Sequence, residues 1–227
     1  MVNPASASAA DYRARMAQVL GVYLVTDEAS CAGRSLADVV MAAVQGGVTC
    51  VQLREKFLST RDFCAKAVAL QALLAPLGIP LVINDRVDIA LACGASGVHL
   101  GQSDLSVAQA RRLLPPSVFL GWSVETLGHV AQAAHADFAG VDYLGVSPVF
   151  ATPTKTDTSA PWGLDGLRQA RAATTLPLVA IGGIHAGNAA EVLAAGAHGL
   201  AVVSAVCGAI DPAAAARELR MIWDAQA

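Results

Sequence analysis

The chain has 227 residues, of which 55% are hydrophobic and 15% are charged. This length allows one large buried core and matches a minimal (β/α)₈ barrel, which needs roughly 200–250 residues. The formal net charge of −3 and the lack of a basic tract exclude an electrostatic case for nucleic-acid binding.

Cysteine usage and hydropathy indicate the compartment. The five cysteines are scattered and show no CxxC spacing, so free thiols in a reducing cytosol are expected rather than a structural zinc site. The N-terminal segment lacks the apolar core of a signal peptide, and every apolar run is interrupted well before the ~18 residues of a membrane span. We therefore expect a soluble, cytoplasmic protein that does not enter a membrane.

Short aliphatic runs alternate with longer Ala-rich stretches along almost the whole chain. Strands are expected over 21–26, 50–54, 80–84, 97–100, 118–121, 143–146, 177–181 and 199–203. Helices are expected over 35–45, 60–77, 87–93, 106–114, 124–134, 164–172, 186–195 and 212–225. Such a repeat predicts an α/β fold, a single-domain (β/α)₈ TIM barrel over residues 18–227, after a flexible N-terminal tail over residues 1–17. An open doubly wound sheet is the alternative, but it would favour a GxGxxG turn that the sequence lacks.

Polar residues gather immediately after the expected strands. They are Thr26, Asp27, Arg54, Glu55, Lys56, Asn84, Asp85, Gln102, Asp104, Ser123, Thr152 to Lys155, Gly182, Gly183 and Ser204. In a parallel barrel the carboxyl ends of all strands lie on one rim, where such enzymes place their sites. Helix capping would account for Ser, Asp and Asn, but it does not call for a Gln, an Arg and two Lys.

The segment after the second strand predicts an anion site. Gln52, Arg54 and Lys56 alternate along the chain, so they share one side of the strand. Arg offers bidentate contacts and Lys a point charge, a set that suits a diphosphate. The alternative is a solvated strand end at which Glu55 pairs with either cation.

Two carboxylates on adjacent strand ends predict a divalent-metal site. Asp85 follows the third expected strand and Asp104 follows the fourth. Mg²⁺ takes one or two carboxylates together with phosphate oxygens and water. The alternative reading makes each aspartate a cap of the helix that follows it.

A second anion site is expected between the last two strand ends. Gly182 and Gly183 allow close approach of the backbone, and Ser204 begins a segment after the eighth strand. The alternative is that these glycines serve only a tight turn. The loop from Thr152 to Gly163 is long and polar and could close over a substrate.

The histidines and Trp122 add little to this rim. His99 is expected inside the barrel rather than as a base, and the other histidines have no carboxylate or Cys at metal or triad spacing. Trp122 could stack on a substrate ring or pack against a helix. Two phosphate-type sites without an obvious nucleophile favour displacement of diphosphate by a phosphorylated partner.

Taken in order, VQLREK, INDRVDIA, GVHLGQSD, YLGVSPVFATPTK and AIGGI resemble the thiamine-phosphate synthase family from Tyr23 to Ala205. The resemblance implies a Mg²⁺-dependent transferase of thiamine biosynthesis. Its small-molecule substrates would be 4-amino-2-methyl-5-(diphosphooxymethyl)pyrimidine and a thiazole phosphate, either 4-methyl-5-(2-phosphooxyethyl)thiazole or its carboxylate form. Its products would be thiamine phosphate and diphosphate, formed by a dissociative mechanism. A homo-oligomer is compatible with the sequence.

The resemblance also implies residue roles. Gln52, Arg54, Lys56, Asn84, Ser123 and Lys155 would bind the pyrimidine diphosphate, with Arg54, Lys56, Ser123 and Lys155 acting in catalysis. Asp85 and Asp104 would hold Mg²⁺. Thr152, Thr154, Gly183, Val203 and Ser204 would bind the thiazole phosphate. Ser147 departs from the family, which more often has Gly there.

Two other functions fit parts of this pattern. A related barrel could tautomerise the thiazole phosphate without forming a C–N bond, and it would not need the cations together with both aspartates. A non-catalytic regulator could instead bind thiamine precursors on a decayed site. The presence of both candidate metal ligands argues against that second reading.

Overall fold

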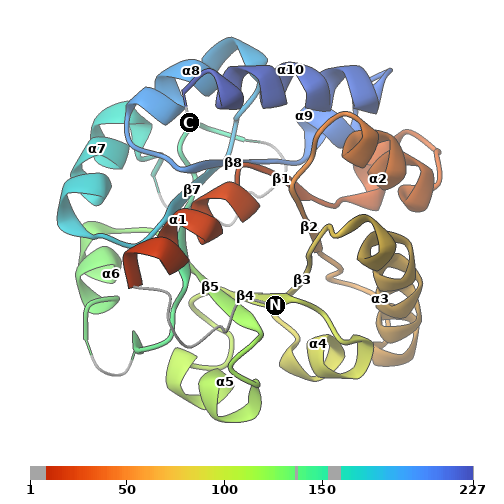
Figure 1. The fold of residues 1–227 in the computed structure, drawn as a ribbon, viewed down its shortest axis with the longest axis horizontal. Helices are drawn as coiled ribbons and strands as arrows, with labels where there is room; N and C mark the ends of the chain where they lie inside the picture. The colour runs from red at the N-terminus through yellow and green to blue at the C-terminus, as the bar shows by residue number, and fades with distance from the viewer. Residues whose placement is uncertain (1–8, 136–137, 153–159, 227) are drawn as a thin grey trace.

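Eight parallel strands close into a barrel in the computed structural model, which describes residues 9–135, 138–152 and 160–226. The strands are β1 (Val22–Val25), β2 (Cys50–Leu53), β3 (Leu81–Asn84), β4 (Gly97–Leu100), β5 (Phe119–Val124), β6 (Tyr143–Val146), β7 (Leu178–Ile181) and β8 (Gly199–Val202). Each strand pairs with its neighbours in sequence, and β8 pairs with β1, so that Tyr23 lies opposite Ala201. The predicted TIM barrel is confirmed (Figure 1).

Helices surround the barrel on its outer side (Figure 1). They are α2 (Leu36–Gln45), α3 (Thr60–Leu74), α4 (Val87–Cys93), α5 (Val107–Leu113), α6 (Leu127–Gln132), α7 (Gly163–Ala173), α8 (Ala186–Ala194) and α10 (Pro212–Asp224). Short helical turns η2 (Glu28–Cys31), η3 (Ala75–Leu77) and α9 (Ser204–Cys207) lie in the connections. None of the helices in the described ranges has both the length and the apolar character needed to span a bilayer.

Polar caps set where several helices begin. The side chains of Ser35, Ser59 and Ser106 each accept a hydrogen bond from a backbone N–H of the first turn. Thr126 caps α6 in the same way, so this helix begins at Leu127 rather than at residue 124. The strand before it is correspondingly longer than expected, because β5 continues to Val124.

The N-terminal segment differs from the sequence-based expectation of a flexible tail up to residue 17. Ala9–Val19 forms a helix, α1, which crosses the end of the barrel where the strands begin (Figure 1). Its anchors are apolar, since Met16 is buried and Leu20 just beyond the helix is fully buried. Both belong to the cluster that fills the barrel interior, and that burial explains why the helix docks here.

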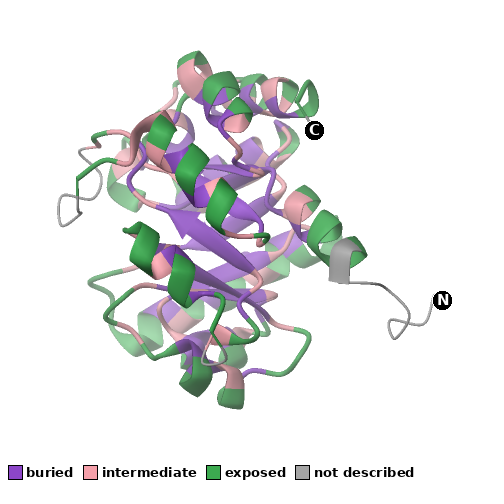
Figure 2. Ribbon diagram, turned by 90° about the vertical axis from the view of Figure 1, so that its left-hand side faces the viewer, coloured by how far each residue is buried: buried purple, intermediate pink, exposed green. Residues whose placement is uncertain are grey.

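Two apolar layers hold the fold together. The strands that lie between them are buried (Figure 2). The larger layer lies between the outer face of the strands and the helices. The smaller layer fills the barrel interior with Tyr23, Phe119 and Tyr143 among its members. Strands buried on both faces explain the high hydrophobic content of the chain.

Gly121 tests how tightly the interior is packed. A Cβ atom at this position would overlap the ring of Tyr143, so Gly121→Ala should cost about 1–3 kcal/mol of unfolding free energy and lower Tm by several degrees. Gly128→Ala on exposed α6 is the matched control, because its Cβ would meet nothing closer than 3.5 Å and should leave Tm unchanged or raise it. Thermal unfolding followed by circular dichroism measures both, and equal Tm values would contradict the packing argument.

Candidate active site

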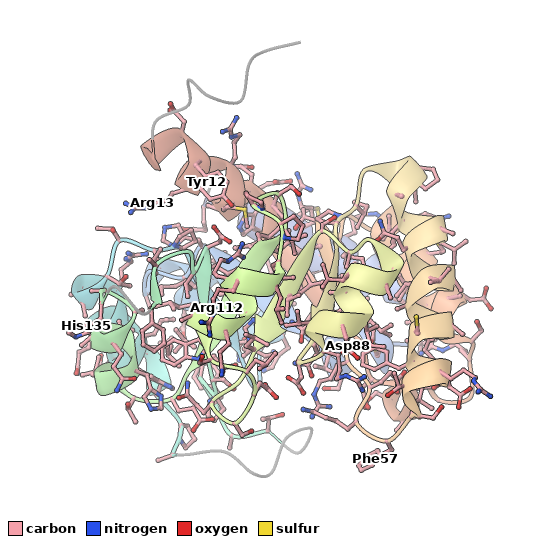
Figure 3. The ribbon with its side chains drawn as sticks, turned by 90° about the horizontal axis from the view of Figure 1, so that it is seen from below. Tyr12, Arg13, Phe57, Asp88, Arg112 and His135 are labelled. Atoms are coloured by element: carbon pink, nitrogen blue, oxygen red, sulfur yellow. The ribbon has the colours of Figure 1, made fainter. Side chains whose placement is uncertain are left out.

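A cavity of about 370 Å³ opens at the carboxyl ends of the strands. Its wall contains all the described residues that the sequence assigns to one anion site and its metal: Gln52, Arg54, Lys56, Asn84, Asp85, Asp104 and Ser123. The exposed Phe57, which follows Lys56, marks this rim, and Tyr12 on α1 marks the opposite end of the molecule (Figure 3). Lys155 lies outside the described residues.

The cations of this rim are directed to the cavity and not to Glu55. The carboxylate of Glu55 accepts from Nζ of Lys66 at 2.6 Å, so the alternative in which Glu55 pairs with Arg54 or Lys56 is wrong. Lys56 Nζ instead lies 2.5 Å from Oδ2 of Asp85. Among the described residues, the guanidinium of Arg54 makes no ion pair, so it is available to an anionic ligand.

Asp85 and Asp104 converge across the mouth from β3 and β4. The pKa of Asp104 is raised by burial and by the neighbouring carboxyl of Asp85, while the backbone N–H of Gly101 and the charge of Lys56 oppose the rise. Gly101 N–H donates to Asp104 Oδ2 at 2.6 Å. Two carboxylates held this close are unfavourable without a cation between them.

Neither aspartate caps a helix, so the capping alternative is wrong. The residue before α4 is Arg86, which makes no side-chain cap, and α5 is capped by Ser106. Asp85 also has a left-handed backbone, with φ of 63°. Aspartate tolerates this conformation better than most residues, and such strain often accompanies a functional site.

The Asn84 side chain binds Asp85 through its amide nitrogen, and its amide oxygen is a candidate metal ligand. Its Nδ2 donates to Asp85 Oδ1 at 2.6 Å. Its Oδ1 is buried without a hydrogen-bond partner in the described part of the chain. A buried carbonyl oxygen beside two carboxylates provides a donor set of hard oxygen atoms, the chemistry that Mg²⁺ prefers.

The part of the chain that the structure describes contains no larger cluster of potential metal ligands. Within residues 9–135, 138–152 and 160–226, no group of three or more His, Cys, Asp or Glu side chains could hold an ion. The two aspartates alone would therefore leave most coordination positions to a ligand and to water. That arrangement is usual for Mg²⁺, which keeps several waters and binds through one or two carboxylates.

A second cavity of about 90 Å³ adjoins the first and shares Arg54 and Ser147 with it. Its wall contains the remaining described residues of the predicted second anion site: Thr152, Gly183, Val203 and Ser204. Gly182 and Gly183 both have positive φ, so they form a tight turn and also line the cavity. Thr154 lies outside the described residues.

Sequence patterns alone did not identify Tyr23 and Tyr143 as part of the first cavity. Only the alternation of side chains along each strand could have indicated that these two tyrosines face inward. His99 lies in the barrel interior as expected, with its ring nitrogens 2.9 Å from the Tyr143 hydroxyl and from Ser123 Oγ. Trp122 packs outward against Phe138, with ring centroids 4.4 Å apart, so the substrate-stacking alternative is wrong.

A closed parallel barrel with a charged cavity at the carboxyl ends of its strands defines a (β/α)₈-barrel enzyme. Comparison with known proteins narrows this class. The family model described as thiamine monophosphate synthase matches residues 22–206. The chain belongs to this family.

Individual relatives agree with the family match. The thiamine-phosphate synthase of Albidiferax ferrireducens is 73% identical over 208 residues, covering 92% of this chain and 94% of that protein. The thiamine-phosphate synthase of Chloroflexus aurantiacus is 52% identical, covering 88% and 91%. A solved thiamine phosphate pyrophosphorylase from Pyrococcus furiosus superimposes with a TM-score of 0.83 at 36% identity, covering 93% of this chain and 98% of that one.

The electrostatic interaction between Asp85 and Asp104 can be tested by substitution. Asp85→Asn should lower the pKa of Asp104 toward its usual value but not fully, because burial remains. A raised folded-state pKa means that the folded protein binds this proton more tightly, so unfolding free energy falls as pH rises from the usual aspartate range through the raised value. Carboxyl ¹³C titration of Asp104 in both proteins measures the shift. An unchanged pKa in Asp85→Asn would show that the two groups do not interact.

Proposed function

We propose that this chain joins 4-amino-2-methyl-5-(diphosphooxymethyl)pyrimidine to a thiazole phosphate, releasing diphosphate and forming thiamine phosphate. The observation that carries the proposal is the pair of adjoining cavities that share Arg54. One has cations beside two carboxylates, and the other has glycine backbone and Ser204. Two differently built phosphate sites suit two phosphorylated substrates held side by side.

The first cavity would take the pyrimidine diphosphate. Arg54 and Lys56 would bind the diphosphate oxygens, and Asp85 and Asp104 would hold Mg²⁺. The fit of the metal is supported by the close carboxyl groups and by Oδ1 of Asn84, which is buried and has no hydrogen-bond partner among the described residues. When bound, the ion would neutralise charge on the departing diphosphate. Lys56, now paired with Asp85, would turn to the substrate once the cation shares that carboxylate.

The second cavity would take the thiazole phosphate. Backbone N–H groups near Gly183 and at Val203 and Ser204 could donate to its phosphate oxygens. Thr152 and Ser204 would add hydroxyl contacts, and Thr154 belongs to the same proposal from sequence. Because the cavities adjoin, the thiazole nitrogen would lie near the pyrimidine methylene.

The proposed reaction is dissociative. The bond between the methylene carbon and the diphosphate oxygen breaks first, and both electrons leave with the oxygen. Arg54, Lys56 and Lys155 would stabilise that growing negative charge. The aminopyrimidine delocalises the positive charge left on the methylene, which the thiazole nitrogen then attacks. No proton needs to be removed by a side-chain base.

Metal dependence tests the carboxylate assignment. Wild-type protein should show a higher Tm on addition of MgCl₂, and EDTA should abolish turnover. Asp104→Ala should show neither the Tm increase with MgCl₂ nor any turnover, while it retains the circular dichroism spectrum of the wild-type protein. Asp88→Ala, an exposed aspartate on α4 that pairs with Arg86, is the control and should keep both. Full activity after EDTA treatment would refute the metal assignment.

Separate substrate sites predict separable defects. Ser204→Ala should raise KM for the thiazole phosphate about 10- to 100-fold, because a hydrogen bond to a charged group contributes roughly 1.5–3 kcal/mol. Its KM for the pyrimidine diphosphate should not change. Lys56→Ala should show the reverse pattern. Initial-rate kinetics with each substrate varied in turn measures both, and equal damage to the two KM values would mean that the sites are not separate.

Bond breaking ahead of bond making predicts an electronic effect. A pyrimidine diphosphate with trifluoromethyl in place of the ring methyl should react far more slowly, since the group destabilises a methylene cation. Its binding should change little, because the diphosphate contacts remain. Single-turnover rates measure the effect. Equal rates for the two compounds would favour direct displacement by the thiazole nitrogen instead.

An assay of diphosphate release with one or both substrates separates the synthase from the tautomerase and the regulator. Diphosphate release that requires both substrates supports the synthase. Conversion of thiazole phosphate alone would indicate a tautomerase, and binding without turnover would indicate a regulator.

A further inference from the structure

A chain of hydrogen bonds crosses the barrel interior and joins two walls of the first cavity. The Gln52 amide Nε2 donates to the Tyr23 hydroxyl at 2.8 Å, and this hydroxyl lies 3.0 Å from that of Tyr143. The Tyr143 hydroxyl lies 2.9 Å from Nδ1 of His99. Nε2 of His99 lies 2.9 Å from Ser123 Oγ. Gln52 and Ser123, the two ends of the chain, both line the cavity.

The barrel leaves room for this chain at two glycines. A Cβ atom at Gly121 would overlap the phenol ring of Tyr143, and one at Gly145 would lie 2.9 Å from Cε1 of His99. Tyr23 and Tyr143 are buried, and their rings meet edge to face with centroids 6.1 Å apart. The rings are therefore held by packing as well as by their hydrogen bonds.

Counting the available protons gives the direction of donation along this series of hydrogen bonds. Each tyrosine hydroxyl has one proton to donate, and burial raises the pKa of both phenols, so both remain protonated. Among the described residues, the Tyr23 hydroxyl forms hydrogen bonds only with the Gln52 amide and the Tyr143 hydroxyl. Since it accepts from Gln52, its own proton goes to Tyr143.

The same logic continues to the other wall. Tyr143 accepts from Tyr23, so its proton goes to Nδ1 of His99. A neutral imidazole that accepts at Nδ1 carries its proton on Nε2, which then donates to Ser123 Oγ. The hydroxyl proton of Ser123 is left to be donated elsewhere, toward the cavity that Ser123 lines.

We propose that Tyr143 and His99 are positioning residues that hold Ser123 as a hydrogen-bond donor to the pyrimidine diphosphate. The identity of that substrate rests on the proposed function. At the other end, Nε2 of Gln52 is occupied by Tyr23, which leaves its Oε1 as an acceptor. The chain thus presents an acceptor on one wall and a donor on the other, a pattern that complements the amino group and the acceptor atoms of an aminopyrimidine diphosphate.

The tautomer of His99 is the direct test. Long-range ¹H–¹⁵N spectra of labelled wild-type protein at neutral pH, assigned with His99→Gln, should show a neutral ring protonated on Nε2. Tyr23→Phe should show the same tautomer, because Tyr143 then has His99 as its acceptor. A ring protonated on Nδ1 in the wild-type protein would overturn the proposal.

Kinetics provide the functional test. Tyr143→Phe removes one hydroxyl and should lower kcat/KM for the pyrimidine diphosphate about 10-fold or more, with KM for the thiazole phosphate unchanged. Tyr12→Phe is the matched control, since it removes a tyrosine hydroxyl that donates to Asp142 Oδ1 at 2.9 Å. This hydroxyl takes no part in the hydrogen bonds between Gln52 and Ser123. Equal kcat/KM values in the two variants would overturn the positioning role.

Two safeguards keep these outcomes distinct. The spectra of the wild-type protein decide the direction of the chain even if Tyr143→Phe does not fold. Absence of turnover by the wild-type protein would refute the proposed function, whereas the tautomer, measured without substrate, reports on the hydrogen bonds alone.

Discussion

Closure of the parallel sheet is the constraint on which the rest of the molecule depends. Pairing of β8 with β1 removes both edges, so every strand is buried between the interior and the surrounding helices. Any polar side chain that points inward must then find a partner or reach the mouth of the barrel. Gln52, Asn84 and Thr26 are the buried polar residues among those described, and all three lie at the carboxyl ends of strands.

The charges at the mouth depend on one another in a way that favours ligand binding. Asp85 and Asp104 repel each other, and Lys56 offsets part of this cost by pairing with Asp85. A cation between the carboxylates would release Lys56, and a diphosphate would then satisfy both Lys56 and Arg54. Under the proposed function, charges that remain poorly compensated in the free protein would become fully compensated only when metal and anion are bound together.

The interior of the barrel contributes to the chemistry of its mouth. Side chains below the rim usually serve packing, but Tyr23, Tyr143 and His99 connect Gln52 to Ser123 through buried hydrogen bonds. Gly121 and Gly145 make space for these rings by lacking side chains. Packing and polarity are therefore coupled, since a change in the interior layer would move groups that line the cavity.

The sequence by itself determined the barrel, because eight buried strands with intervening helices leave a strong periodic pattern and strand ends share one rim. It also brought Arg54, Lys56, Asp85 and Asp104 into one predicted group, since each lies within four residues of the carboxyl end of a strand. Only the tertiary structure showed that Ala9–Val19 docks as a helix, that Glu55 pairs with Lys66, and that Tyr23 meets Tyr143. These contacts join side chains whose encounter depends on barrel closure and strand register, and no local pattern in the chain encodes such distances.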